Sequence, residues 1–511
     1  MSCLKTRTLL LLTLATGALS AQADVSVSAM FGDHMVFQRE QANPVWGKAG
    51  PGEKIAVSIN GQTKTTEADA DGDWMVKIDA LPTGGPYELT IKGNNTLTFT
   101  DVLSGEVWVC SGQSNMQWPL DRTDFAELEL ASANYPQIRL MTVNSPATQE
   151  PQFTFNNEWQ VCTPESVKSF SAVGYLFGKR LYNTLHVPVG LIDNAWGGSA
   201  LEAWLPREKF DVDEFHTQFL KNYDEKVANY TDENRKQDLA KWEDETAEWK
   251  ANGSKGRAPR KPSDPRYNQH RPANLYNGRI APILGYGIRG VIWYQGETNG
   301  SRGYQYRTSF PLMIETWREA WDQGDFPFYW VQLADYRDES DEPGSSGWAE
   351  LREAQTLTLS LPNTGQAVIV DVGEGRDIHP RNKQVVANRL ALLALTKDYG
   401  YDFAAESPLY DSMEVKGNKV VLTFDNIDQG LYTFDVNKPI GFAVAGEDQK
   451  FVWADAKITG KDTIEVWSKD VPNPVAVRYA WANNPVCNVQ DRNGLPLTPF
   501  RTDDWKITSQ K

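Results

Sequence analysis

The pattern of hydrophobic and polar residues changes twice along the chain and divides it into three zones. In the first zone, residues 24–104, apolar and polar residues alternate with period two in short runs such as 54–59 and 74–78. Turn signals such as Asn60-Gly61 separate these runs. This alternation is typical of half-buried antiparallel strands. The first zone is therefore predicted to form a β-sandwich-like domain.

In the second zone, residues 105–404, apolar strand-like runs alternate with segments of helical periodicity. The alternation predicts an α/β fold with a doubly wound parallel sheet and helices on both faces. Ligands bind at the carboxyl ends of the strands in sheets of this kind. The expected strands are 107–110, 138–143, 189–194, 290–294, 328–333 and 367–372, and the expected helices include 173–185, 310–321 and 385–397.

A charged insertion interrupts the second zone at about residues 205–277. Leu239, Trp242, Thr246 and Trp249 recur there at helical spacing, which predicts a helix with one packed stripe. Two arrangements are open: a helical hairpin that covers the functional site, or a solvated helix. The third zone, residues 405–511, returns to period-two alternation and is predicted to be a C-terminal β-rich domain.

The first 23 residues have the composition of a signal peptide. A basic start is followed by a short apolar run at 8–15 and by Ala21-Gln-Ala23, which has the small-x-small form of a cleavage site. The run is too short to span a bilayer, and no later segment reaches the required length. The protein is therefore expected to be secreted or periplasmic, with no membrane-spanning segment.

The negative net charge of the chain argues against polyanionic ligands. The chain has 511 residues and a formal net charge of −16, which argues against nucleic acid because a polyanion would be repelled. A neutral carbohydrate is compatible with this charge, whereas an anionic sugar needs a local basic group. The spacing of the cysteines offers no zinc site, and no metal or cofactor is expected. The oligomeric state is not predicted.

Two short segments carry the candidate chemistry. Gly112-Gln-Ser-Asn-Met116 follows a predicted strand directly, so Ser114 is expected at the carboxyl edge of the sheet beside a helix N-terminus. A nucleophilic serine needs a general base that a third group orients. Among the five histidines, only His379 follows a strand at that edge and has a carboxylate, Asp377, two residues before it.

Together with two further blocks, these segments resemble the SGNH-type hydrolases, and within them the bacterial sialate O-acetylesterase-like family. The four blocks are 112–116, 188–204, 291–299 and 377–380. The resemblance implies an α/β hydrolase that removes acetyl esters from sugars through an acetyl-serine intermediate. It further implies that Ser114 is the nucleophile, that His379 is the base, and that the oxyanion is held by the backbone N–H groups of Ser114 and Gly198 and by the side-chain amide of Gln295.

The chain departs from the common SGNH pattern at two positions. Many members have asparagine in the third block, where this chain has Gln295, as the sugar esterases do. The usual acid lies three residues before the histidine, and that position is Arg376 here. Asp377 is favoured as the third member of the triad, and Glu374 is the alternative.

Other functions remain open at this point. The substrate is expected to be an acetylated carbohydrate, either a sialic acid or a plant polysaccharide such as xylan or xyloglucan. A non-catalytic carbohydrate-binding protein is a second alternative and would not need Ser114 and His379 together. A lipase or peptidase of the α/β-hydrolase type is disfavoured because Met116 stands where its motif requires glycine. The tryptophans Trp118, Trp196 and Trp293 could line a sugar site or pack in the core.

Overall fold

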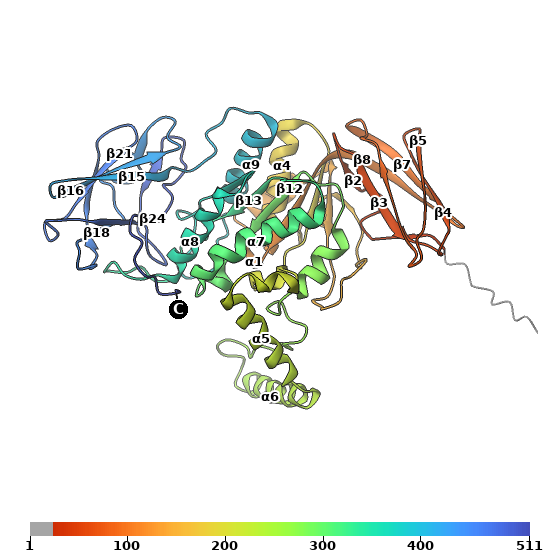
Figure 1. Ribbon diagram of the computed structural model, residues 1–511, viewed down its shortest axis with the longest axis horizontal. Coiled ribbons are helices and arrows are strands. Elements are labelled where there is room, and N and C mark those ends of the chain that lie inside the picture. Colours follow the sequence, from red (N-terminus) through yellow and green to blue (C-terminus); the bar gives the residue numbers. More distant parts are fainter. Residues whose placement is uncertain (1–23, 511) are drawn as a thin grey trace, which may run out of the picture.

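The computed structural model describes residues 24–510, which form three parts in a row (Figure 1). A β domain at the N-terminal side and a β domain at the C-terminal side flank a central α/β part. The predicted signal peptide, residues 1–23, lies outside the described residues. Within residues 24–510, no helix is long and apolar enough to cross a membrane.

The N-terminal part consists of two β-sheets with an apolar interior. One sheet has the order β1 (Ser26–Val27), β3 (Asn43–Lys48) and β6 (Asp73–Ile78). The other contains β5 (Gln62–Glu67), β4 (Lys54–Ile59), β7 (Gly84–Lys92) and the first half of β8 (Thr96–Gly112), and β2 (Val36–Gln38) pairs with β8. Alternate residues of β4, namely Ile55, Val57 and Ile59, are buried, as the period-two pattern predicts.

Strand β8 belongs to both the N-terminal part and the central sheet. Its first half pairs with β7, and its last residues pair with strands of the central sheet. The domain boundary expected between residues 104 and 105 therefore falls inside one continuous strand. The end of β8, where Ser114 follows, is consequently anchored by two sheets.

The central sheet has the predicted parallel, doubly wound architecture (Figure 1). Its order is β10 (Gln160–Cys162), β9 (Tyr135–Thr142), β11 (Val189–Asp193), β8, β12 (Gly290–Tyr294), β13 (Phe328–Val331) and β14 (Thr364–Ala367). All neighbours in it are parallel except β10 and β9. After β8 the chain forms β9, β10 and β11 on one side of β8 and then β12, β13 and β14 on the other side. The carboxyl end of β8 is thus the switch point at which such sheets bind ligands.

The last strand of this sheet differs from the prediction. A strand was expected at 367–372, but β14 ends at Ala367. Val368, Ile369 and Val370 are buried, so their apolar character reflects packing and not sheet pairing. Among residues 24–510, no strand follows β14 at this edge of the sheet. A buried apolar run beside an edge strand has the same sequence pattern as a strand that pairs within a sheet.

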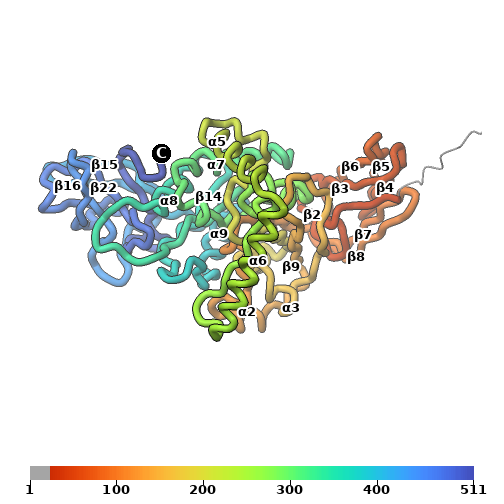
Figure 2. The backbone as a smooth tube through the Cα atoms, turned by 90° about the horizontal axis from the view of Figure 1, so that it is seen from below, coloured from red at the N-terminus to blue at the C-terminus, as the bar shows by residue number. Residues whose placement is uncertain are grey.

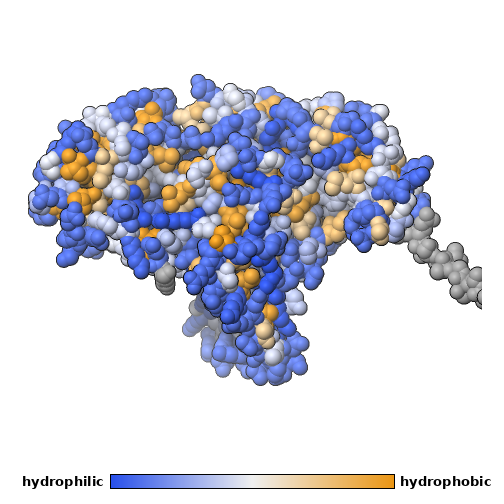
Figure 3. Space-filling view, viewed as in Figure 1, coloured by the Kyte–Doolittle hydropathy of each residue, from blue (hydrophilic) through white to orange (hydrophobic). Residues whose placement is uncertain are grey.

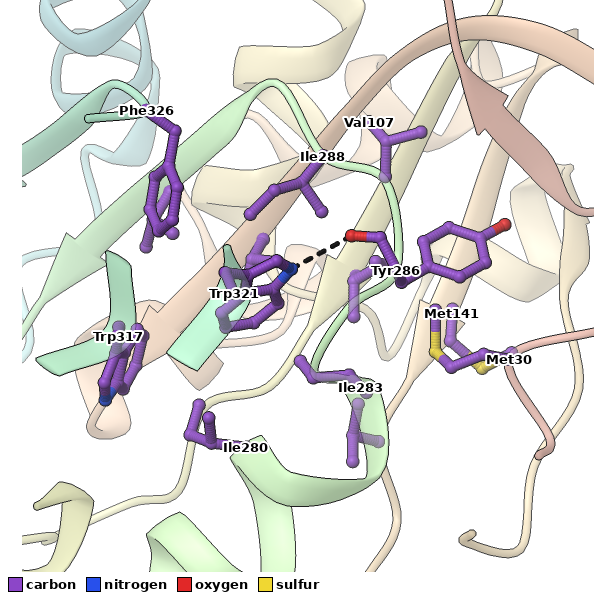
Figure 4. Packing of buried hydrophobic residues seen from close by; sticks show 14 of the residues in the cluster. Met30, Val107, Met141, Ile280, Ile283, Tyr286, Ile288, Trp317, Trp321 and Phe326 are labelled. Atoms are coloured by element: carbon purple, nitrogen blue, oxygen red, sulfur yellow. Dashed lines mark hydrogen bonds between the residues drawn. The ribbon is translucent and has the colours of Figure 1, made fainter. Parts of the chain in front are cut away.

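Helices cover both faces of the central sheet. Val107 and Val109 of β8 pack in the cluster that includes residues of α7 (Gly303–Trp321) and α8 (Gly347–Leu357), whereas Trp108 and Cys110 pack with α4 (Ala172–Leu185) and α9 (Lys383–Tyr399). The shorter helices are α1 (Ser114–Gln117), α2 (Ala126–Ala131) and α3 (Pro164–Val167). Figure 4 shows the α7 side of the core, where the indole of Trp321 donates a 2.9 Å hydrogen bond to the carbonyl of Tyr286.

The insertion forms an arm that projects from the central part (Figures 1 and 2). It consists of α5 (Glu214–Ala228) and α6 (Asp232–Ala251), and α6 has no buried residue. The arm is largely hydrophilic in Figure 3. The stripe of α6 packs on the returning segment of the arm, where the indole of Trp242 donates to the carbonyl of Pro259 at 3.1 Å. Helix α6 therefore has a solvated face and one packed stripe, as the second alternative describes.

The C-terminal part is β-rich and contacts the central part through the chain end. One sheet contains β15 (Leu409–Lys416), β16 (Lys419–Asp425), β21 (Thr463–Trp467) and β20 (Asp455–Ile458); another contains β19 (Val452–Trp453), β18 (Phe442–Ala445), β22 (Ala476–Tyr479) and β24 (Phe500–Arg501); β17 (Leu431–Thr433) pairs with β23 (Val489–Asp491). Thr508 and Ser509 return to α8, where both donate to the carboxylate of Glu350. Within the part of the chain that the structure describes, Cys110, Cys162 and Cys487 form no disulfide.

Candidate active site

Ser114 begins helix α1 directly after the tight turn that ends β8. Gly112 has a φ of +132°, and a Cβ atom there would lie 2.2 Å from the carbonyl oxygen of Tyr294 on the neighbouring strand. Only glycine fits this position, for both conformation and space. The backbone N–H of Gln113 then donates to the same carbonyl at 2.9 Å. The turn therefore depends on the pairing of β8 with β12.

His379 lies within hydrogen-bond distance of Ser114. Its Nε2 atom is 2.8 Å from Ser114 Oγ, although the two residues are 265 positions apart. The indole of Trp118 stacks on the imidazole, with ring centroids 4.8 Å apart and planes inclined by 18°. When Nδ1 carries the hydrogen, Nε2 accepts from the hydroxyl, which is the geometry that a general base requires.

Asp377, and not Glu374, faces the imidazole. Its Oδ1 atom lies 3.3 Å from His379 Nδ1 and accepts the backbone N–H of His379 at 2.9 Å. The carboxylate of Glu374 instead accepts from the backbone and the guanidinium of Arg381. Burial lowers the pKa of His379, a contribution that the nearby Lys383 reinforces and that Asp377 opposes. The neutral imidazole that a base needs is therefore favoured.

The loop after β11 places backbone N–H groups beside Ser114. The N–H of Trp196 donates to the carbonyl of Gly112 at 3.0 Å, and that of Gly197 donates to Gln117 Oε1 at 2.8 Å. A Cβ atom on Gly197 would lie 3.5 Å from that of Ser114. Within residues 24–510, the N–H groups of Ser114 and Gly198 have no hydrogen-bond acceptor. These two donors are available for a developing oxyanion.

The side chain of Gln295 is placed differently from the expectation. It is fully buried, and its amide donates to the carbonyl of Ser199 at 3.1 Å and to Asn299 Oδ1 at 2.9 Å. Its carbonyl oxygen accepts from the hydroxyl of Tyr306 at 2.9 Å. Both amide hydrogens are therefore used inside the protein, and in this structure the side chain has no free donor for the oxyanion. Its contacts connect the loops after β11 and β12.

A buried polar cluster behind the nucleophile was not found from the sequence. Lys383 Nζ donates to Asn115 Oδ1 at 2.6 Å, and Asn115 Nδ2 donates to Glu297 and to the carbonyl of Ile378. Burial lowers the pKa of Lys383 to about 7 and raises that of Glu297. Asn115 and Glu297 lie within the sequence blocks at 112–116 and 291–299. Lys383 lies outside all four blocks and two residues before the predicted helix at 385–397, so no pattern in the sequence selected it.

Two polar cavities flank the site. The cavity beside Gln117, of about 330 Å³, includes Thr142, Asn144 and Arg279 in its lining. The cavity beside Glu297, of about 480 Å³, includes Ser346 and Asn483. They are called the Gln117 cavity and the Glu297 cavity below. Both lie at loops that follow central strands, which is the edge at which sheets of this kind bind ligands.

The three tryptophans singled out from the sequence have different surroundings. Trp118 stacks on His379, as described above. Trp196 is partly exposed, and the guanidinium of Arg279 lies 4.6 Å from its ring centroid. Trp293 is fully buried in the core under α7. Only the first two therefore lie at the site, and Trp293 has a packing role.

Comparison with known proteins shows the family of this chain. Residues 104–236 and 267–387 match the model of a family described as carbohydrate esterase, sialic acid-specific acetylesterase. The sialate O-acetylesterase of Homo sapiens is 31% identical over 94% of this chain and 93% of its own length. This chain belongs to that family. The family resemblance inferred from the four sequence blocks is thereby confirmed, and the protein is a carbohydrate esterase.

Other relatives of this esterase cover nearly its whole length. The sialate O-acetylesterase of Mus musculus is 30% identical over 96% of this chain and 97% of its own. A crystal structure of a carbohydrate acetylesterase from Xanthomonas citri is 37% identical, covers 94% of this chain and all of its own, and superposes with a TM-score of 0.80. The matched family segments omit residues 237–266, which lie in the arm and its return. Helix α5 and the start of α6 lie inside the matched segments, so only the rest of α6 and the return of the arm fall outside the family model.

Proposed function

We propose that this carbohydrate esterase hydrolyses O-acetyl esters of sugars with Ser114 as nucleophile. The observation that carries the proposal is the 2.8 Å contact of Ser114 Oγ with His379 Nε2, next to two unused backbone N–H groups. His379 takes the hydroxyl proton while Oγ attacks the acetyl carbonyl carbon. The carbonyl oxygen becomes an oxyanion that the N–H groups of Ser114 and Gly198 stabilise. Each such donor contributes roughly 3 kcal/mol in the transition state.

Departure of the sugar and hydrolysis of the acetyl-enzyme use the same residues. His379 returns its proton to the sugar oxygen, the ester C–O bond breaks, and the deacetylated sugar leaves acetyl-Ser114. His379 then removes a proton from water as the water oxygen attacks the acetyl carbon. It gives this proton to Ser114 Oγ when the bond between Oγ and the acetyl carbon breaks, which releases acetic acid and free Ser114. Asp377 orients the imidazole and stabilises its protonated form in both halves of the reaction.

Detection of the acetyl-enzyme tests the mechanism. Mass spectrometry after rapid acid quench is expected to show one added acetyl group on the peptide that contains Ser114. Ser114→Ala is expected to abolish turnover of 4-nitrophenyl acetate with an unchanged circular dichroism spectrum, because Ser114 lies at a partly exposed helix start. Wild-type turnover in this variant would exclude Ser114 as the nucleophile.

O-acetylated sialic acid is the substrate that we propose first, since the matched relatives are named sialate O-acetylesterases. An anionic sugar needs a cation, and Arg279 lines the Gln117 cavity without an ion-pair partner among residues 24–510. Its Nε is buried and unbonded there, while Nη1 donates to the carbonyl of Val143. Glu158 lines the same cavity and works against an anion, so the substrate requires a direct test.

Acetate release from O-acetylated sialoglycoprotein, acetylated xylan and acetylated xyloglucan decides between the candidates. The plant polysaccharides are the second candidate because the net charge of −16 suits a neutral polymer. Arg279→Met is expected to raise KM at least tenfold for the sialoglycoprotein alone. Equal effects on all three substrates would contradict recognition of the sialate carboxylate by Arg279.

We further propose that the enzyme is secreted or periplasmic. The support is the composition of residues 1–23, with a basic start, a short apolar run and a small-x-small site. Expression of the full sequence in a bacterial host, followed by cell fractionation and N-terminal sequencing, tests this. The expected result is activity outside the cytoplasm and a mature N-terminus at about residue 24.

A further inference from the structure

The C-terminal β domain and the loop after β13 line a cavity whose lining includes neither Ser114 nor His379. Its volume is about 430 Å³, and it is called the distal cavity below. Apolar groups line it together with polar ones. The lining includes Trp453, Phe442, Pro485, Val486, Asp341 and Asn484.

Trp453 is the most distinctive residue of the distal cavity. It lies on edge strand β19 and is 45% exposed, which is a large exposure for tryptophan. Its indole N–H donates to the carbonyl of Asp341 at 2.7 Å. This hydrogen bond orients the ring, so little side-chain entropy remains to be lost when a ligand packs on it. Val486, 52% exposed, adds apolar surface in the same cavity.

The charges around the cavity favour a neutral ligand. Glu339 and Asp341 line it, and the single lysine in its lining, Lys438, is paired with Asp455 at 2.6 Å. An anion would therefore be repelled. A pyranose ring fits the apolar and polar groups of this lining. Its C–H face can pack on the ring of Trp453 while its hydroxyl groups bond to polar side chains such as Asn484.

The distal cavity adjoins the Glu297 cavity next to the active site. Arg337, Ser345 and Ser346 line the Glu297 cavity, and residues 339–341 of the same loop line the distal one. The turn after β22 is shared in the same way, since Asn483 lines the first and Asn484 the second. One loop and one turn thus separate the two cavities.

We propose that the distal cavity is a second carbohydrate-binding site, which holds a neutral sugar unit of the same glycan chain that carries the acetyl ester. The proposal rests on the proposed function, because the glycan is the substrate of Ser114. Binding at two sites on one chain raises the effective concentration of the ester at the nucleophile. The enzyme is therefore expected to prefer polymeric over monomeric acetylated sugars.

Affinity gel electrophoresis with the full chain tests the site. Catalytically inactive Ser114→Ala protein is run through gels that contain soluble xylan, xyloglucan or desialylated mucin. We expect retardation by at least one polymer, and loss of that retardation when Trp453→Ala is added. Tyr432→Ala is the matched control, because Tyr432 is 42% exposed on the same domain but does not line the cavity. It is expected to leave the retardation unchanged.

Kinetics separate this proposal from the proposed function. With active protein, Trp453→Ala is expected to raise KM at least fivefold for the retarding polymer in acetylated form and to leave 4-nitrophenyl acetate turnover unchanged. Absence of retardation by every polymer, or equal losses in Trp453→Ala and Tyr432→Ala, would overturn the second site while esterase activity still stood. Retardation that depends on Trp453, in a protein without esterase activity, would contradict only the proposed function and its link to this site.

Discussion

The ammonium group of Lys383 lies 2.6 Å from the side-chain oxygen of Asn115, the residue that directly follows Ser114. Lys383 is fully buried, and its Nζ atom also lies 5.9 Å from the ring centroid of Trp118, which stacks on His379. The buried Lys383 thus contacts the helix that carries the nucleophile and lies close to Trp118, the ring that stacks on the base His379. This arrangement makes Lys383 a positioning residue that also acts on His379 through its charge.

Removal of the Lys383 charge is expected to shift the acid limb of the pH profile of kcat/KM to higher pH. The base must be neutral to act, so kcat/KM rises with pH through the pKa of His379, which is lowered below its usual 6.5. Lys383 contributes to that lowering, and in Lys383→Met the pKa of His379 should rise. The acid limb of kcat/KM for 4-nitrophenyl acetate then moves to higher pH. Lys397→Met, on the same helix but paired with Glu406, is the control and should leave the limb in place.

Substitution of the two candidate acids should separate their roles. Asp377→Asn removes the charge that faces His379 Nδ1 and is expected to lower kcat by roughly 10²- to 10⁴-fold, since Asp377 is half exposed. Glu374→Gln should change kcat by less than about threefold, because Glu374 bonds to Arg381. A large loss only in Glu374→Gln would reverse the assignment. Small losses in both variants would indicate a Ser-His dyad.

Gln295→Ala is expected to act mainly on stability. It leaves the carbonyl of Ser199 and the hydroxyl of Tyr306 without their buried partner, which costs about 2 kcal/mol or more in unfolding free energy. Urea denaturation monitored by tryptophan fluorescence measures this cost. A direct oxyanion donor would behave differently, with kcat about a hundredfold lower and an unchanged unfolding midpoint. That result would restore the role that the family resemblance implied for Gln295.

Gly112→Ala should disrupt the nucleophile turn. The added Cβ atom would lie 2.2 Å from the carbonyl oxygen of Tyr294. We therefore expect that β8 and β12 move apart or that the variant fails to fold. Gly417→Ala is the control for backbone strain alone, since Gly417 has a φ of +66° with open space around it. It should cost about 1 kcal/mol. Thermal unfolding of both variants measures the difference, and equal unfolding temperatures would show that the close approach at Gly112 is unimportant.

The sequence by itself determined the features that depend on local pattern. Period-two alternation predicted strands such as β4, and helical periodicity predicted a helix at 385–397, inside the observed α9. Ser114 and His379 were found because each follows an apolar strand-like run in a short polar segment. Such patterns arise from neighbours within a few residues, which the linear chain displays directly.

Only the tertiary structure decided the features that depend on distant partners. The chain does not display that β8 continues through the expected domain boundary or that β14 ends at Ala367. Nor does it show that the amide of Gln295 is used internally, that Asp377 faces His379, or that Lys383 reaches Asn115 from 268 positions away. The physical reason is the same for all of these. Which hydrogen bond a side chain makes depends on the donors and acceptors that folding brings around it, and no spacing along the chain specifies them.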